Sequence, residues 1–165
     1  MSIDVDNAGP GDYARIVDIY NHYVLNSPAT FDTQPFSLGE RAPWFAQFAS
    51  TGPYQLLVAR RGDDVLGYAY AWRFNPRPAY DISVETTVYV DPDTLGGGVG
   101  SALYAELFRR LAECDLHGAY AGITLPNDAS VRLHQRFGFH EIGVESEVGY
   151  KFDRYWSVGR YERRL

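Results

Sequence analysis

The chain has 165 residues, of which 45% are hydrophobic and 15% aromatic, and its net charge is −6. This length is typical of one domain with a sizeable core, and the composition is too apolar for a disordered chain. The acidic balance argues against nucleic acid and anionic membranes as partners, because both call for a basic face. The chain has no apolar run of the roughly 18 residues that a membrane helix needs, and its first residues lack the pattern of a signal peptide. We therefore expect a soluble, cytoplasmic protein with a single domain over residues 1–165.

The first part of the chain predicts a strand, two helices and a hairpin. Apolar residues recur at helical spacing between Pro10 and Pro28, and a possible capping box of Ser37 and Glu40 opens the second helix. Two apolar runs flank residues 61–64, which is typical of a hairpin. In chain order these elements cover residues 2–7, 10–27, 37–50 and 54–74.

The second part of the chain predicts four strands and two helices. Leu103, Leu107 and Leu111 form one apolar face of the longer helix, and Asn127 or Asp128 is the N-cap of the shorter one. A strand over 81–90, a helix over 100–114, a strand over 118–125, a helix over 127–137 and two strands within 139–165 follow one another. The sequence has no repeat, low-complexity tract or linker, so it predicts one α+β domain.

A glycine-rich stretch, LGGGVG at residues 95–100, separates a predicted strand from a predicted helix. Either it is a tight connection that needs positive φ, or its bare backbone binds an anion at the helix N-terminus. It is not a Walker loop, since Ser101 and Ala102 stand where that motif needs Lys and then Ser or Thr. It is not a dinucleotide fingerprint either, because Leu103 occupies the position of the third glycine.

The stretch does match the glycine end of the acyl-CoA loop, Gln/Arg-x-x-Gly-x-Gly/Ala, of the GCN5-related N-acetyltransferases (GNAT). Four further blocks, spread over most of the chain, resemble the phosphinothricin and methionine-sulfone acetyltransferase branch of that superfamily: IYNHYVLNSPATFDT, NPRPAYDISVETTVYVDP, NDASVRLHQRFGFHEIG and EVGYKFDRYWSV. The resemblance implies a GNAT fold, a curved, mixed but mostly antiparallel sheet of about six or seven strands flanked by about four helices. It also implies that CoA lies in a split between the strands at 85–90 and 118–125.

Glu85 and His134 are the predicted catalytic residues. Glu85 is a carboxylate inside the otherwise uncharged run ISVETTVYV, residues 82–90, where burial would raise its pKa from about 4.3. The resemblance makes it the general base. It is alternatively an outward-facing strand residue. His134 stands where many relatives have a tyrosine that protonates the leaving thiolate, and it is alternatively a helix histidine paired with the backbone.

The resemblance places the cofactor on the strand, the glycine loop and the short helix, with a strand amide within Tyr89–Val90 for the oxyanion. The loop departs from the family pattern, because Leu95, Gly96 and Gly97 replace the usual Arg or Gln and basic residues. We expect weaker CoA binding unless Arg132 or Arg136 supplies the missing charge. The predicted cofactor residues are Val88, Tyr89, Val90, Leu95, Gly96, Gly97, Gly98, Val99, Gly100, Ser101, Asn127 and Ser130.

The acceptor is predicted to bind near the proline-rich loop that precedes the Glu85 strand. Arg73 and Arg77 suit bidentate capture of carboxylate, phosphinate or sulfone oxygens, although surface arginines are commonly only solvated. Aromatic residues that could wall an amino-acid pocket, or instead form core or dimer contacts, are Phe31, Tyr80 and Tyr155. His22, His117 and His140 lack ligand spacing, so no metal is predicted, and Cys114 is expected to be a buried residue without a catalytic role.

The resemblance therefore implies direct acetyl transfer from acetyl-CoA to the α-amine of a small amino-acid analogue, such as phosphinothricin, methionine sulfoximine or methionine sulfone, by a homodimer. Two alternatives stay open. One is acetylation of another amine, such as a peptide N-terminus or a polyamine. The other is a CoA-binding module without catalysis, which the incomplete loop suggests.

Overall fold

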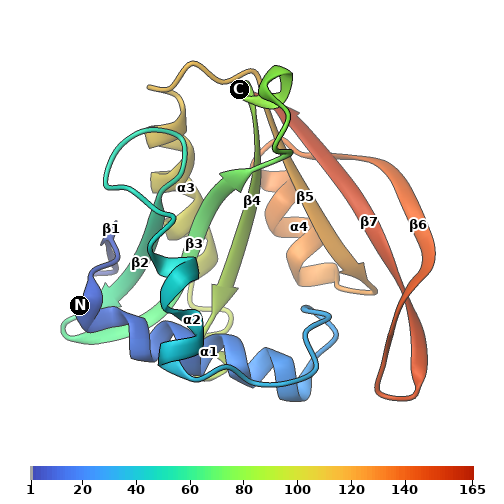
Figure 1. Ribbon diagram of the computed structural model, residues 1–165, viewed down its shortest axis with the longest axis horizontal. Helices are drawn as coiled ribbons and strands as arrows, with labels where there is room; N and C mark the ends of the chain where they lie inside the picture. The colour runs from blue at the N-terminus through green and yellow to red at the C-terminus, as the bar shows by residue number, and fades with distance from the viewer. Residues whose placement is uncertain (1) are drawn as a thin grey trace.

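The strands form one seven-stranded sheet in the order β1-β2-β3-β4-β5-β7-β6 (Figure 1). The structure is a computed structural model, and it describes residues 2–165. All neighbouring strands are antiparallel except β4 and β5, which are parallel, so the predicted mixed, mostly antiparallel sheet is confirmed. The strands are β1 (Asp4–Asn7), β2 (Leu56–Arg61), β3 (Asp64–Arg73), β4 (Ser83–Val90), β5 (Gly118–Leu125), β6 (His140–Lys151) and β7 (Arg154–Arg164).

Four α-helices flank the sheet: α1 (Tyr13–Asn26), α2 (Leu38–Phe45), α3 (Val99–Leu111) and α4 (Asp128–Arg136). The predicted capping box is present, because the Ser37 hydroxyl accepts from the Glu40 amide and the Glu40 carboxylate accepts from the Ser37 amide. Asn127, not Asp128, is the N-cap of α4, since its side chain accepts from the Ser130 amide at 3.1 Å. Single 3₁₀ turns cover 10–12, 78–80 and 92–94.

The sheet separates two apolar layers, one on each face. α1 and α2 pack on one face, where buried side chains such as Ile16 and Val24 meet Tyr68 of β3. α3 packs on the other, and its predicted leucine face is confirmed, because Leu103, Leu107 and Leu111 are fully buried. Helices on both faces leave only the edges and one internal gap of the sheet for a ligand.

That gap lies between β4 and β5. The two strands pair only where Ser83–Glu85 lie beside Gly118–Tyr120, and beyond this point they diverge (Figure 1). β4 is the last strand of one antiparallel unit and β5 the first of another. The predicted split of the sheet is therefore present at the predicted strands.

Two further observations complete the fold. No helix within residues 2–165 is both long and apolar enough to cross a membrane. The expectation that Cys114 lies buried in the helix is wrong: α3 ends at Leu111, and Cys114 sits half-exposed in the following turn. Within residues 2–165, the one hydrogen-bond partner of its Sγ is the Arg110 carbonyl, at 3.7 Å.

Candidate active site

A cavity of about 310 Å³ occupies the split of the sheet. Its walls come from β4 on one side, β5 on the other and α4 beyond, with Tyr23 and Ala29 of the α1 region at its rim. Several residues predicted from the sequence line it, namely Val88, Tyr89, Val90, Leu95, Asn127, Ser130 and His134. The split therefore opens a channel in which a long, narrow ligand can lie between two strands.

The backbone of β4 turns unpaired amides toward this channel. The Asp91 amide donates to the Leu66 carbonyl of β3 at 2.8 Å. Amides of successive strand residues point to opposite sides, so those of Val88 and Val90 point away from β3, into the split. The Tyr89 amide points toward β3. The Tyr23 hydroxyl donates to the Val90 carbonyl at 2.5 Å, so this carbonyl already has a partner.

The glycine-rich loop presents the N-terminus of α3. Gly98 is the N-cap with a φ of 80°, a left-handed conformation that favours glycine. The first helical bond is donated by the Ala102 amide to the Gly98 carbonyl at 3.0 Å. The amides of Val99, Gly100 and Ser101 precede that bond and have no helical acceptor, so they point out of the helix end as an anion site.

Gly100 is needed for packing, since a Cβ there would lie 3.2 Å from the Leu133 side chain of α4. The close approach of the two helices brings α4 to the loop. Arg136, the last residue of α4, donates from Nη1 to the Ser101 hydroxyl at 2.8 Å. Arg132 makes no side-chain hydrogen bond within residues 2–165. Of the two arginines considered from the sequence, Arg136 is the one that the fold brings to the loop.

His134 lies on the cavity wall with both ring nitrogens in hydrogen bonds. Its Nδ1 lies 2.7 Å from the Ser130 carbonyl, which only accepts, so Nδ1 carries the proton. Its Nε2 lies 3.0 Å from the Tyr104 hydroxyl of α3 and accepts from it in the neutral ring. Burial lowers the pKa of His134, so the neutral form predominates at neutral pH. The histidine is thus held in one orientation by α3 and by its own helix.

Glu85 lies where the pairing of β4 with β5 ends. It is opposite Trp72 of β3 and Tyr120 of β5, and it is half-buried. Burial raises the pKa of its carboxyl group, and the nearby Arg160 partly opposes that rise. A carboxylate with a raised pKa is a better proton acceptor near neutral pH than an ordinary glutamate. Glu85 directly precedes Thr86, which lines the cavity.

Aromatic side chains extend the Glu85 face of the sheet. Phe74 lies with its ring centre 4.6 Å from that of Tyr120 and 5.6 Å from that of Tyr80. Because Tyr120 is the β5 neighbour of Glu85, this chain of rings links the predicted Tyr80 to the carboxylate. Phe31, in the segment between α1 and α2, packs its ring over Gly149 of β6.

The structure does not bring Arg73 to the Glu85 face. Arg73 pairs with Val84, whose side chain is in the core under α3, and its guanidinium lies 5.9 Å from the ring centre of Tyr54. Arg77 is exposed in the loop before β4. Tyr155 lies near the tip of the β6–β7 hairpin, 61% exposed and packed against Tyr150. None of these three residues is among those that line the cavity of the split.

Sequence reasoning missed two residues of this region, Tyr104 and Arg160. In the sequence, Tyr104 looks like another core residue on the apolar face of α3. Only the fold shows that its hydroxyl forms a hydrogen bond with His134. Arg160 is one of several arginines in the last strand, and only the strand order places it beside β5. No spacing in the sequence signals either contact, because each joins segments that are far apart in the chain.

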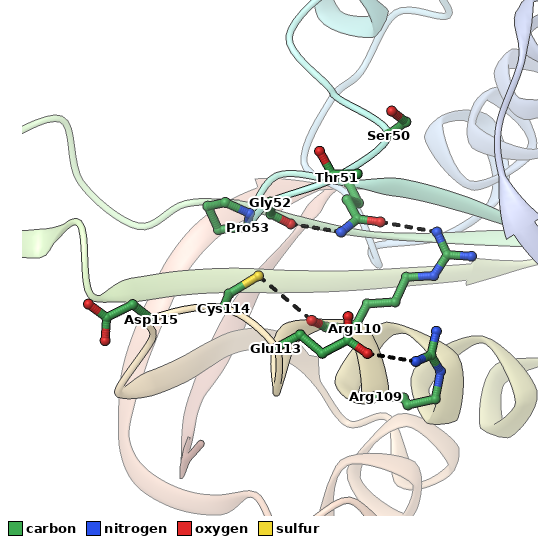
Figure 2. Close-up of a pocket in the computed structure, with 10 residues that line it drawn as sticks. Ser50, Thr51, Gly52, Pro53, Arg109, Arg110, Glu113, Cys114 and Asp115 are labelled. Atoms are coloured by element: carbon green, nitrogen blue, oxygen red, sulfur yellow. Dashed lines mark hydrogen bonds and ion pairs between the residues drawn. The ribbon is translucent and has the colours of Figure 1, made fainter.

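A larger hollow, of about 520 Å³, lies elsewhere, beside the end of α3 (Figure 2). Both of its arginines are paired with neighbouring acidic or amide side chains. Arg110 contacts Glu106, Asp6, Asn7 and Gln55, and Arg109 contacts Glu106 and Glu113. This hollow has neither the unpaired amides nor the half-buried acid of the split, so we place the reaction in the split. No cluster of three potential metal ligands occurs among residues 2–165.

A split sheet, a helix N-terminus with unpaired amides and a half-buried acid at the junction are the features expected of an acyltransferase site for an acyl-CoA. A model of the Acetyltransferase (GNAT) family matches residues 16–139. The chain belongs to this family and is an acetyltransferase that uses acetyl-CoA. The resemblance and the fold class expected from the sequence are thereby confirmed.

Similar proteins cover nearly the whole chain. Phosphinothricin N-acetyltransferase of Streptomyces coelicolor is 54% identical over 156 residues, which make up 93% of this chain and 91% of that protein. L-methionine sulfoximine/L-methionine sulfone acetyltransferase of Pseudomonas paraeruginosa is 38% identical over 94% of this chain and 90% of that protein. The crystal structure of a phosphinothricin acetyltransferase from Sinorhizobium meliloti with acetyl-CoA has a TM-score of 0.94 and 32% identity, covering 100% of this chain and 89% of that one.

Proposed function

We propose that this enzyme acetylates the α-amine of a small amino-acid analogue of the phosphinothricin, methionine sulfoximine or methionine sulfone type. The single observation that carries the proposal is the position of half-buried Glu85 at the junction of β4 and β5, directly beside the cavity of the split. The names of similar proteins support the substrate class, since they act on phosphinothricin or on methionine sulfoximine and sulfone.

Glu85 is the proposed general base. It takes a proton from the substrate ammonium, directly or through a water, and the free amine attacks the thioester carbonyl of acetyl-CoA. The tetrahedral oxyanion accepts a hydrogen bond from the Val90 amide, which faces the split. Collapse of this intermediate forms the amide bond and breaks the C–S bond, so the acetyl group passes directly to the acceptor without a covalent enzyme intermediate.

CoA leaves as a thiolate, and His134 is the proposed proton donor. A thiol has a pKa of about 8.5, so its thiolate is a moderate leaving group and proton delivery is a smaller contribution than removal of the amine proton. Neutral His134 holds its proton at Nδ1 toward the Ser130 carbonyl. To act as the donor, the ring first takes up a proton from solvent at Nε2. Nε2 then gives this proton to the thiolate sulfur as the Tyr104 hydroxyl turns away, and the ring returns to its neutral form.

The proposed cofactor site combines strand amides, the α3 N-terminus and one arginine. The pyrophosphate would accept from the amides of Val99, Gly100 and Ser101. Arg136, held at the Ser101 hydroxyl, supplies the positive charge that Leu95 to Gly97 lack. Asn127 and Ser130 lie on the cavity wall, where the pantetheine arm would pass. The cofactor site thus compensates for its incomplete loop from the neighbouring helix.

A thiol-release assay tests the proposed substrate class. Purified enzyme with acetyl-CoA is offered L-phosphinothricin, L-methionine sulfoximine, L-methionine sulfone, spermidine and an N-terminal peptide amine. We expect thiol release with the amino-acid analogues, and mass spectrometry should locate the new acetyl group on the α-amine. Faster turnover of spermidine or the peptide would refute the proposed class and favour acetylation of another amine.

We further propose that residues 1–165 are one domain and that two copies associate through the β6–β7 hairpin. β6 is an edge strand, and apolar side chains along the hairpin are exposed, namely Ile142, Val144, Val148, Tyr150, Phe152 and Tyr155. An exposed apolar edge strand is a surface that a second chain readily covers. Light scattering should give twice the chain mass for the parent and the single-chain mass for Val144→Asp. A monomeric parent would exclude the dimer.

A further inference from the structure

Arg160 of β7 lies on the same side of the sheet as Glu85. β5 joins the two residues, because Tyr120 is the partner of Glu85 and Gly122, two positions further on, is the partner of Arg160. Alternate residues of a strand share one face, so the side chains of Tyr120 and of Arg160 emerge on the face that carries Glu85. The two-residue offset corresponds to about 6.6 Å along the strand.

Gly122 makes room for the Arg160 guanidinium. A Cβ on Gly122 would lie 2.9 Å from Nη1 and 3.7 Å from Cζ of Arg160, so the guanidinium lies against the bare backbone of β5. The φ of Gly122 is not in the left-handed region, so the glycine is not required by the backbone. Its function is close approach. Gly122 also lines the cavity of the split, and the guanidinium thus lies at the border of that cavity.

The guanidinium keeps donors for a ligand. Its Nε forms an ion pair with Glu145 of β6, and no hydrogen bond from either Nη group is found within residues 2–165. The side chain is 46% exposed. A guanidinium has a planar fork of donors that matches a carboxylate in bidentate geometry, and one anchored edge leaves the other edge available. Glu145 therefore orients the guanidinium through Nε and leaves its Nη donors available to a ligand.

We propose that Arg160 binds the α-carboxylate of the acceptor while Glu85 receives the proton of its α-amine. The inference rests on the proposed function and deepens it, because it selects acceptors that carry a carboxylate next to the amine. The amine and carboxylate of an α-amino acid share one carbon atom. Glu85 and Arg160 extend from the two strands that flank β5 over the same sheet face, so their opposite charges can meet these two groups of one acceptor. Acceptors without that carboxylate, such as amino-acid amides and polyamines, leave the guanidinium without a partner.

The test compares L-methionine sulfone with its carboxamide in the parent and in three variants. Arg160→Gln removes the charge, and Gly122→Ala displaces the guanidinium through the new Cβ. Glu145→Gln is the matched control, since it removes the charge of the partner while its amide oxygen can still accept from Nε and hold the guanidinium. Thiol release gives kcat and KM for each acceptor, and thermal melting shows whether each variant is folded. Calorimetry measures the Kd of L-methionine sulfone with CoA present.

We expect the parent to prefer the acid to the amide, and Arg160→Gln to lower kcat/KM for the acid roughly 10- to 100-fold, chiefly through KM. The kcat/KM for the amide should change little in Arg160→Gln. Gly122→Ala should also reduce the preference for the acid over the amide, and Glu145→Gln should retain that preference. Equal effects of Arg160→Gln on acid and amide would overturn the proposal and leave the proposed function intact. If the parent acetylates neither, the proposed function fails, and an unchanged Kd in Arg160→Gln then overturns the role of Arg160 separately.

Discussion

The cofactor side and the acceptor side of the split are built from different groups. On the cofactor side, the ligand would meet backbone amides of β4 and α3, with Arg136 hydrogen-bonded to Ser101 in the first turn of α3. On the acceptor side, the groups are side chains, Glu85 and Arg160, on two strands that diverge. Backbone amides are present whatever the side chains are, so they can bind the same cofactor despite changes in sequence. On the acceptor side the binding groups are side chains, so one substitution can change which acceptor binds. We therefore expect mutations on the acceptor side to affect catalysis and substrate choice, and mutations on the cofactor side to affect the affinity for acetyl-CoA.

The largest expected effect is on the acceptor side. Glu85→Gln keeps the shape of the side chain but removes the base, so kcat/KM for the acceptor should fall by about 10²- to 10⁴-fold. The Kd of acetyl-CoA, measured by calorimetry, should stay near the parent value. If Glu85→Gln lost cofactor affinity as well, the separation between the two sides would be incorrect.

On the cofactor side, Arg136→Gln should weaken acetyl-CoA binding by about 10- to 100-fold, because a charge-assisted hydrogen bond contributes about 1.5–3 kcal/mol. Arg132→Gln is the matched control on the same helix, and it should change the Kd little. Gly97→Arg restores a cation to the loop and should tighten binding. Equal Kd values for the parent and both glutamine variants would show that the amides and helix dipole hold the pyrophosphate alone.

A third region, the contact of the β6–β7 hairpin with the α1–α2 loop, should affect stability first. Lys151 is buried, and its Nζ donates to the carbonyls of Ser27 at 2.7 Å and Thr30 at 2.8 Å, with Tyr23 at 3.4 Å. Lys151→Met leaves these carbonyls without their donor, so the free energy of unfolding in urea should fall by about 1–3 kcal/mol. Ser146→Ala, exposed on the same strand, is the control and should be nearly neutral. A stable Lys151→Met enzyme would mean that water replaces the ammonium group.

The smallest expected effect is a shift of the pH profile. Arg160 lowers the pKa of Glu85, whose burial raises it. Arg160→Gln removes the positive charge, which disfavours the carboxylate form, so the pKa of Glu85 should rise. The acidic limb of kcat should then move to higher pH, measured with a saturating acceptor. An unchanged or lower limb would place the two side chains too far apart in solution to interact.

Much of the fold and the cofactor side could be predicted from the sequence because both depend on local patterns. The apolar spacing of α3, the capping box at Ser37 and the glycines before Val99 each lie within a short segment, so their patterns can be recognised without knowledge of the fold. Resemblance then supplied the mixed sheet, the split between two of its strands and the proposed role of Glu85. The proposed role of Arg160 could not be found in this way, since it depends on the contact of Arg160 with Gly122. These two residues are neighbours only because β5 pairs with β7. The same holds for Tyr104 and His134, which meet across two helices.

The central claim is that acetyl-CoA and the acceptor meet in one complex at the split, with Glu85 between them. Initial rates measured with both substrates varied test it most directly. Direct transfer predicts double-reciprocal lines that intersect, because both substrates must be bound before either product leaves. Parallel lines, together with an acetylated enzyme isolated after exposure to acetyl-CoA alone, would indicate a covalent intermediate and contradict the account.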